Sequence, residues 1–257
     1  MNIYVCIKQV PDTETKIKLN PNQSGIDTTG IKWIVSPYDE FAVEEALRLK
    51  EKNPGSTVTV LSAGPSRVIE AIRTALATGA DQGIHIEIPE TADNHLTAKA
   101  LAGALKKETQ VDLIFTGKEA IDDGASQVSQ LVAEYLHLPC VSVVNSIQYG
   151  NQTVQCKREI EGGSIEILES SMPVLIAAQK GLNEPRYASL PNILKAKKKE
   201  VKSLKLGDIG VSEADQKIRY KNFQLPPPKQ AGKKISGDPT AQAKELVRIL
   251  HAEAKVV

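Results

Sequence analysis

Residues 113–136 read LIFTGKEAIDDGASQVSQLVAEYL. A short apolar run ends at Thr116 and is followed by Gly117, a polar loop, a second glycine and a stretch with the apolar spacing of a helix. A buried strand that leads through such a loop into a helix is typical of a βαβ unit. This stretch therefore predicts a parallel sheet with helices packed against it.

The same alternation occupies the first 140 residues. Runs that are almost continuously apolar predict strands covered on both faces, at 3–7, 57–62, 83–86, 113–116 and 141–144, and one more such run follows later in the chain, at 173–178. Between them, apolar residues recur at helical spacing within 39–52, 69–76, 96–105 and 128–136. We therefore expect an α/β fold with a mostly parallel, doubly wound sheet.

The pattern changes after Val144. The segments 146–149, 153–159 and 164–169 are short and alternating, and hairpin signals separate them, Gly150-Asn151 and Gly162-Gly163. Antiparallel strands are therefore expected to extend the sheet.

Beyond Gly181 the sequence is rich in proline and lysine, with a lysine run at 197–199 and three prolines at 226–228. This composition predicts an extended arm. The arm ends in an amphipathic segment, 239–254, which as an isolated helix is marginal in water and needs a surface to dock on. The predicted division is a nucleotide-binding α/β domain at 1–184 and an extended C-terminal arm at 185–257.

The composition excludes several classes of function. The net charge is +1 and aromatic residues make up 4% of the chain, so nucleic acid is not the expected partner. No apolar run approaches the roughly 18 residues of a membrane span. The chain begins directly with a strand, and its three cysteines form no disulfide framework. We expect a cytoplasmic protein, or the mature form of an organelle protein, that does not insert into a membrane.

Ligands of parallel sheets bind beyond the carboxyl ends of the strands, which makes three loops candidates: 8–11, 63–66 and 117–128. In the last one, Gly124 and its small neighbours would let a phosphate approach the start of a helix. Alternatively, Asp122 and Asp123 merely cap that helix, and both interpretations stay open. No catalytic set of side chains and no metal-ligand spacing is present, and the pair Glu44-Glu45 is expected to be a solvated helix face.

Several long segments resemble those of electron transfer flavoprotein beta subunits: 36–46, 73–81, 117–127, 157–163 and, most closely, 181–199, which begins Gly181-Leu182-Asn183-Glu184-Pro185-Arg186-Tyr187. The likeness runs from Met1 to about the last twenty residues. It implies an adenine nucleotide α-hydrolase-like fold and an electron-carrier subunit that is not itself an enzyme. It also implies an obligate heterodimer with an alpha subunit that holds most of the FAD.

The resemblance also implies partners and a second ligand. Electrons would come from acyl-CoA-type dehydrogenases and pass to a membrane quinone oxidoreductase. The beta subunit would bind AMP as a structural ligand. By position, the AMP site would involve Cys6, Ser36, Ala63, Asp122, Asp123, Gly124, Ala125, Ser126, Gln127 and Val128.

Two further regions follow from the same resemblance. Thr13 and Tyr38 would lie near the flavin. Leu182 would be the anchor that enters a dehydrogenase pocket, and the docking loop around it would comprise Asn183, Glu184, Pro185, Arg186 and Tyr187. The alternative for Leu182 is a core residue that ends the preceding strand.

Three other functions are less consistent with these residues. In a bifurcating subset of the family a second FAD replaces AMP; Asp122-Asp123-Gly124-Ala125 and Glu184 favour AMP, whereas Val128 resembles the bifurcating type. An α-hydrolase-type enzyme would need a phosphate loop after the first strand, which 8–11 does not supply. A universal-stress-type nucleotide-binding protein fits poorly with the long arm.

Overall fold

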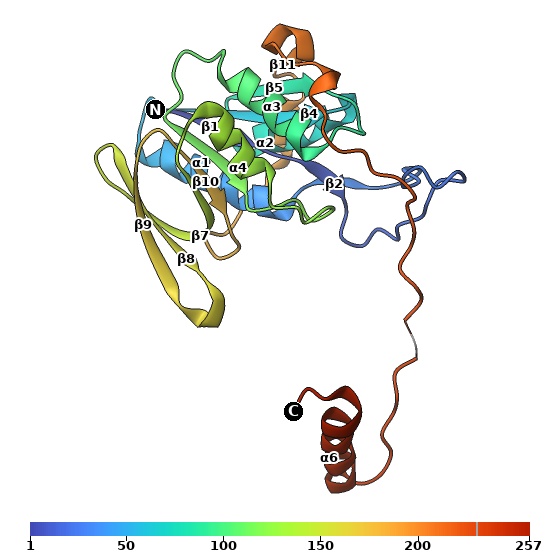
Figure 1. Cartoon of the computed structure of the whole chain (residues 1–257). Coiled ribbons are helices and arrows are strands. Elements are labelled where there is room, and N and C mark those ends of the chain that lie inside the picture. The colour runs from blue at the N-terminus through green and yellow to red at the C-terminus, as the bar shows by residue number, and fades with distance from the viewer. Residues whose placement is uncertain (230) are drawn as a thin grey trace. The chain divides into compact units, whose positions relative to one another are not determined.

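The structure, a computed structural model, describes residues 1–229 and 231–257. The strands of its main sheet are β1 (Asn2–Cys6), β4 (Thr57–Gly64), β5 (Gln82–Glu87), β6 (Leu113–Gly117), β7 (Cys140–Tyr149), β8 (Thr153–Glu159), β9 (Ile165–Ser171), β10 (Val174–Ala178) and β11 (Val201–Lys205). In these described residues they form one nine-stranded sheet in the order β11-β5-β4-β1-β6-β10-β7-β8-β9 (Figure 1). A separate antiparallel pair joins β2 (Gln9–Pro11) to β3 (Trp33–Val35).

The sheet is parallel from β11 to β7, and the last two pairings, β7 with β8 and β8 with β9, are antiparallel. In the centre, Val5 of β1 lies opposite Val60 of β4 and Phe115 of β6. Gly162 and Gly163 turn the chain between β8 and β9 with φ angles of 78° and 75°, which glycine adopts without steric strain. The predicted mostly parallel sheet with an antiparallel extension is confirmed.

Helices cover both faces of the sheet. They are α1 (Pro37–Lys52), α2 (Ile69–Thr78), α3 (Asn94–Leu105), α4 (Val128–Leu136) and α5 (Leu190–Ala196), with short 3₁₀ turns at Ser66–Val68, Glu161–Gly163, Leu206–Ile209 and Glu213–Asp215. Ile3 and Val5 of β1 pack with α1 and α2, whereas Tyr4 and Cys6 pack with α3 and α4. Alternate side chains thus enter two cores, as expected for a strand buried on both faces, and the doubly wound architecture is confirmed.

The position of β11 differs from the prediction. This strand lies within the segment expected to be an arm, yet it pairs in parallel with β5, with Val201 opposite Gly83. One compact unit comprises Met1–Ile17 and Asp27–Lys221, so it continues well past the predicted boundary between residues 184 and 185. Only Leu204 of β11 is buried. Because the rest of this edge strand is rich in lysine and mostly exposed, its sequence lacks the apolar pattern that predicts a strand.

A second unit comprises Lys18–Ile26 and Asn222–Val257. Its helix α6 (Pro239–Arg248) begins after Asp238, whose carboxylate accepts hydrogen bonds from the amides of Thr240 and Ala241. A wider helical turn, Ile249–Ala254, follows directly, so the helix predicted at 239–254 is confirmed. Residues 222–229 and 231–238 contain no helix or strand. Residue 230, in the predicted arm, lies outside the described residues.

Candidate functional site

The order of the strands reverses beside β1, and we call the region beyond the carboxyl ends of β1 and β6 the crevice. After β1 the chain builds β4 and β5 on one side of it and then crosses to β6 on the other side. Such a reversal separates the loops that follow the two strands, and ligands of α/β sheets bind there, beyond the carboxyl ends. The segments 8–11, 63–66 and 117–128 all lie at this edge of the sheet, as the sequence indicated, although residues 9–11 form strand β2 and residues 63–64 still belong to β4.

Asp39, in the first turn of α1, joins both sides of this crevice. One carboxylate oxygen accepts a hydrogen bond of 2.7 Å from the amide of Lys8, just after β1. The other accepts one of 2.8 Å from the amide of Gly117, at the end of β6. The side chain is buried, with 6% of the residue exposed, so these two amides are its immediate polar surroundings.

Gly117 is required here for space. A Cβ atom at this position would lie 2.6 Å from Asp39 Oδ1 and 2.7 Å from Tyr38 Cβ. Atoms do not approach so closely without displacement of the helix or the strand. The glycine that ends the apolar run of β6 therefore lets the first turn of α1 approach the strand.

Burial governs the charge of Asp39 and of its neighbour Cys6. Desolvation raises the pKa of Asp39 to about 7, although the hydrogen bonds from the amides of Lys8 and Gly117 oppose the rise. Burial, and secondarily the charge of Asp39, raises the pKa of the Cys6 thiol to about 12. Cys6 is therefore an apolar wall residue at neutral pH and not a nucleophile.

The side chain of Lys8 spans the crevice. Its amine lies 2.8 Å from Asp122 Oδ1 and 3.3 Å from Asp123 Oδ2, both in the loop after β6. All three side chains are partly exposed, so this pairing contributes little to stability. Its effect is to offset two acidic charges at a place where the sequence predicted a bound anion.

The loop after β6 does not cap α4 through its acidic residues. Asp123 accepts a hydrogen bond from the amide of Ala125 inside the loop, and α4 begins after Gln127, whose side chain makes no capping hydrogen bond. Gly124 and Ser126 both have positive φ angles, 56° and 52°. The alternative interpretation, in which Asp122 and Asp123 merely cap the helix, is therefore wrong.

Ser36 supplies an unsatisfied polar group in the crevice. It precedes α1, is completely buried, and its Oγ has no hydrogen-bond partner among the described residues. Buried hydroxyl groups in proteins are nearly always hydrogen-bonded. A polar ligand atom or an ordered water molecule at the start of α1 would satisfy this hydroxyl.

The remaining predicted ligand residues lie at the same edge. Ala63, half-buried near the end of β4, follows Ser62, whose hydroxyl donates a hydrogen bond of 2.9 Å to the carbonyl of Ile7. Val128 is half-buried at the start of α4 and belongs to the core on that face. The structure thus brings the predicted AMP-site residues to one edge of the sheet.

The two residues predicted to lie near a flavin differ in their surroundings. Tyr38 is half-buried, and the amine of Lys118 lies 4.9 Å from the centre of its ring. Lys118 also pairs with Glu119 at 3.2 Å. Thr13 is exposed, and its hydroxyl lies 3.4 Å from Asp12 Oδ1.

Helix α1 also holds the predicted docking loop. Arg186 places its guanidinium against Glu44 at 2.8 Å and also pairs with Glu51. Asn183 donates to the carbonyl of Phe41 at 3.0 Å and to Glu45 at 3.1 Å. The loop is therefore fixed to the middle and the end of α1 by charged and polar contacts.

These contacts correct the expectation of a solvated Glu44-Glu45 pair. Glu44 is 4% exposed and Glu45 is 9% exposed. Burial alone would raise the pKa of Glu44, but hydrogen bonds from Arg186 and Arg48 hold it below its ordinary value. Glu45 also accepts a hydrogen bond of 2.8 Å from the hydroxyl of Tyr149.

The side chains that the docking loop presents to solvent lie later in the sequence than expected. Leu182 is half-buried and packs against the core shared with α1, whereas Tyr187 is 98% exposed and Leu190 is 78% exposed. Glu184 is exposed and Pro185 is half-buried. Exposed apolar side chains continue along α5 with Ile193 and Leu194.

Helix α5, which carries part of this apolar surface, is fixed to the fold. A guanidinium nitrogen of Arg73, in α2, donates to the carbonyls of Ala196 and Lys197 at 2.9 and 2.7 Å. The amine of Lys199 donates to the carbonyl of Ala80 at 2.7 Å. The bonds from Arg73 satisfy carbonyls at the end of α5, and the bond from Lys199 ties the segment after α5 to Ala80, so the exposed apolar residues stand on an anchored helix.

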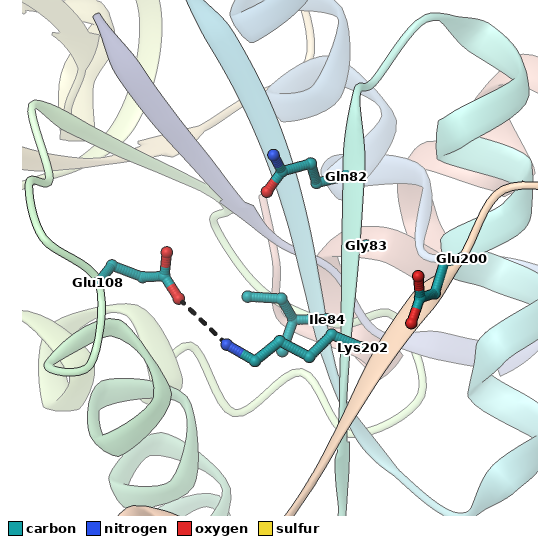
Figure 2. A pocket seen from close by; sticks show the side chains of 6 residues that line it. All are labelled: Gln82, Gly83, Ile84, Glu108, Glu200 and Lys202. Carbon is teal, nitrogen blue, oxygen red and sulfur yellow. Dashed lines mark ion pairs between the residues drawn. The ribbon is translucent and has the colours of Figure 1, made fainter.

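A surface pocket lies away from the crevice, beside the first residues of β5 and β11 (Figure 2). Gln82, Gly83 and Ile84 of β5 line it, together with Glu108, Glu200 and Lys202. Lys202 and Glu108 face each other across the pocket at 3.9 Å. None of the predicted site residues belongs to it.

Two absences hold for residues 1–229 and 231–257. In this part of the chain, no three His, Cys, Asp or Glu side chains are grouped so that they could hold a metal ion. Nor does any helix there combine the length and the apolar character needed to cross a membrane.

Comparison with known proteins gives a consistent result. The family model described as "Electron transfer flavoprotein domain" matches residues 24–209. "Electron transfer flavoprotein subunit beta" of Bacillus subtilis is 41% identical and covers 100% of both chains. The proteins of the same name from Bos taurus and Syntrophomonas wolfei are 42% and 41% identical, over 97% and 100% of this chain and 99% and 98% of their own. The chain therefore belongs to the family of electron transfer flavoprotein beta subunits.

Proposed function

We propose that the chain carries electrons as one half of a heterodimer with an electron transfer flavoprotein alpha subunit. It accepts them from acyl-CoA-type dehydrogenases and delivers them to a membrane quinone oxidoreductase. The electron-carrying chemistry comes from FAD, which the alpha subunit holds for the most part. The match to beta subunits over the whole length of this chain carries the proposal.

In this proposal the crevice beside β1 binds AMP as a structural ligand. The buried hydroxyl of Ser36 needs a polar partner, and the start of α4 lacks a side-chain cap. Backbone amides at a helix start favour a phosphate, and Gly124 in the preceding loop leaves room for one. The amine of Lys8 offsets the charges of Asp122 and Asp123, which would otherwise repel the phosphate.

Tyr38 and Thr13 are proposed to face the flavin from this subunit. Support for Tyr38 is its half-buried ring, which Lys118 covers on one side at the crevice edge. Thr13 is exposed on the loop after β2, so it is accessible to a partner subunit.

The docking loop and the start of α5 are proposed to bind the dehydrogenase. Leu182 was the anchor expected from the resemblance, but exposure favours Tyr187 and Leu190 as the side chains that enter a partner pocket. Lys195, Lys197 and Lys198 are exposed on the same segment, so the partner surface around the pocket would be acidic.

Nucleotide analysis of the heterodimer tests the cofactor proposal. The complex should be yellow and should release about one FAD and one AMP per heterodimer on denaturation. Two FAD and no AMP would contradict the AMP site and favour the bifurcating type. Failure of the chain to bind any alpha subunit would contradict the function as a whole.

Two leucine variants test the docking proposal in the heterodimer. Leu190→Ala should slow electron transfer from a dehydrogenase about tenfold or more at low concentration, because an exposed apolar anchor is removed. Its thermal stability and FAD content should not change. Leu182→Ala should instead lower the free energy of unfolding by about 2 kcal/mol, because its side chain packs against the core. The reverse pattern would restore Leu182 as the anchor.

A further inference from the structure

The carboxylate of Asp39 is bonded in a way that its position in α1 does not require. In a capping box, the side chain of the third helical residue accepts a hydrogen bond from the backbone amide of the N-cap residue. Asp39 is the third residue of α1 and Ser36 is its N-cap residue. In this chain the amide of Ser36 donates instead to the carbonyl of Lys8 at 2.9 Å. Asp39 is free to turn away from α1 and binds amides that lie 31 and 78 residues away along the chain.

Both amides border the crevice. The amide of Lys8 follows β1, and the amide of Gly117 ends β6, the two strands between which the order of the sheet reverses. Gly117 is also the residue from which the loop to α4 departs, and Lys8 is the residue whose side chain reaches Asp122 and Asp123 in that loop. One carboxylate thus fixes the backbone on both sides of the crevice.

An ionised carboxylate offers each of the two amides a strong acceptor. In a protonated carboxyl group the hydroxyl oxygen is a much weaker acceptor and its hydrogen needs a partner of its own, so the amide that faces it loses most of its hydrogen bond. Such a buried, unpaired amide is unfavourable, and the loop that carries it would shift or open. The same holds for asparagine, which has the shape of aspartate but one acceptor oxygen.

We propose that Asp39 is a positioning residue for the proposed adenylate site. The negative charge of its carboxylate holds the end of β1 and the end of β6 at the spacing that a bound phosphate requires. This inference rests on the proposed AMP function. Its consequence is that adenylate affinity falls when Asp39 takes up a proton.

Charged and titratable groups reach Asp39 from each element packed around it. The amine of Lys8, after β1, favours the ionised form, and Asp122, after β6, disfavours it. Cys6 of β1 is neutral at physiological pH because its pKa is raised to about 12. On α1 the neighbouring Tyr38 carries the amine of Lys118 over its ring. With these groups in place, burial sets the midpoint for protonation of Asp39 at about pH 7.

The test compares AMP binding by the wild-type heterodimer and by Asp39→Asn between about pH 5.5 and about pH 8.5, using calorimetry on complexes stripped of nucleotide. The phosphate of AMP has its own ionisation near pH 6, about the value for phosphate monoesters, and it affects both proteins equally. The ratio of the two dissociation constants therefore reports Asp39 alone. We expect the variant to bind about tenfold more weakly at high pH, with the difference falling to about twofold or less at low pH.

Asp112→Asn is the matched control. Asp112 accepts a hydrogen bond of 2.7 Å from the amide of Asn2, at the opposite end of β1. It removes the same kind of bond from the same strand, and AMP affinity should stay within about twofold of wild type at every pH. A ratio for Asp39→Asn that does not vary with pH would overturn the proposal, because a purely structural role predicts a constant loss.

A second measurement needs no variant and no nucleotide. In the wild-type complex, the ¹⁵N amide resonances of Lys8 and Gly117 should shift together with a midpoint near pH 7, while that of Asn2 should not. If the complex bound no AMP at any pH, the proposed nucleotide function would fail, and these resonances would then decide the role of Asp39. Their joint titration would support the positioning role of Asp39, and its absence would overturn that role.

Discussion

The parallel strands of the central sheet end at an amino edge, where they begin, and at a carboxyl edge, where they stop. At both edges a carboxylate accepts hydrogen bonds from backbone amides, but these bonds serve different purposes. At the amino edge, Asp112 accepts a hydrogen bond from the amide of Asn2, and Asp81 accepts one of 2.8 Å from the amide of Val58. At the carboxyl edge, Asp39 accepts two. Asp112 and Asp81 are half-buried, whereas Asp39 is almost completely buried.

This difference in burial indicates that the carboxylates at the amino edge have a structural role, whereas the carboxylate at the carboxyl edge has a functional one. A partly exposed carboxylate keeps much of its hydration, so it satisfies a strand end with little loss of solvation. A buried carboxylate that must ionise is unfavourable for stability. The burial of Asp39 is therefore better explained by the positioning role proposed above than by a contribution to stability. The carboxyl edge also contains the unsatisfied Ser36 hydroxyl, for which the amino edge has no counterpart among the described residues.

The largest effect is expected from alanine at the glycines of the two edges. Gly117→Ala should lower the free energy of unfolding by about 3 kcal/mol, because the added Cβ would overlap Asp39 and Tyr38. Gly55→Ala, before β4 at the amino edge, should lower it by about 1 kcal/mol, because only its φ of 88° is unfavourable and its surroundings are open. Urea unfolding measures both, and equal losses would mean that the carboxyl edge is not tightly packed.

The next effect concerns the pH dependence of stability. The pKa of Asp39 is raised from an ordinary value of 3.8 to about 7 in the folded state. Its contribution to stability is therefore fully present below about pH 4 and is lost as the pH rises through 7. Between about pH 5 and about pH 8 this loss amounts to about 2.6 kcal/mol, and Asp39→Asn should remove it. Unfolding midpoints of both proteins across this range measure the difference, and parallel curves would contradict it.

The smallest effect is a difference in sign between two buried serines. Ser36 has no partner for its hydroxyl, whereas Ser56, 6% exposed at the amino edge, accepts a hydrogen bond of 3.3 Å from the amino group of Met1. In the absence of nucleotide, Ser36→Ala should leave stability unchanged or raise it by up to about 1 kcal/mol, and Ser56→Ala should lower it by about 1 kcal/mol. Thermal unfolding of the nucleotide-free proteins measures both. A clear loss for Ser36→Ala would show that its hydroxyl already has a partner.

The sequence predicted those parts of the fold that depend on local pattern. The apolar runs of β1, β6 and β10 and the helical spacing of α4 gave elements close to those observed, because burial on both faces leaves a strong signal. Strand β11 was missed because it is an edge strand with a single buried residue, Leu204, among lysines. Prolines and lysines there predicted an arm, yet Arg73 ties that region to α2.

The candidate site was predicted in outline, and its decisive contacts were not. The carboxyl edge followed from the order of strands and loops. The role of Asp39 depends on amides that are distant in sequence, and nothing in its own segment indicates them. The local pattern predicts a solvated Glu44 because its partner, Arg186, lies 142 residues away. Such ion pairs depend on tertiary packing, which a local pattern does not encode.

Helix α1 sets the distance between the crevice and the docking loop. Its first turn carries Asp39 at the crevice, and its middle and last turns carry Glu44 and Glu51, which grip Arg186 of the docking loop. Sixteen residues of helix span about 24 Å, and one inserted residue turns everything beyond it by about 100°. The length of α1 is therefore not free to vary, since a single insertion would take either the crevice or the docking loop out of register.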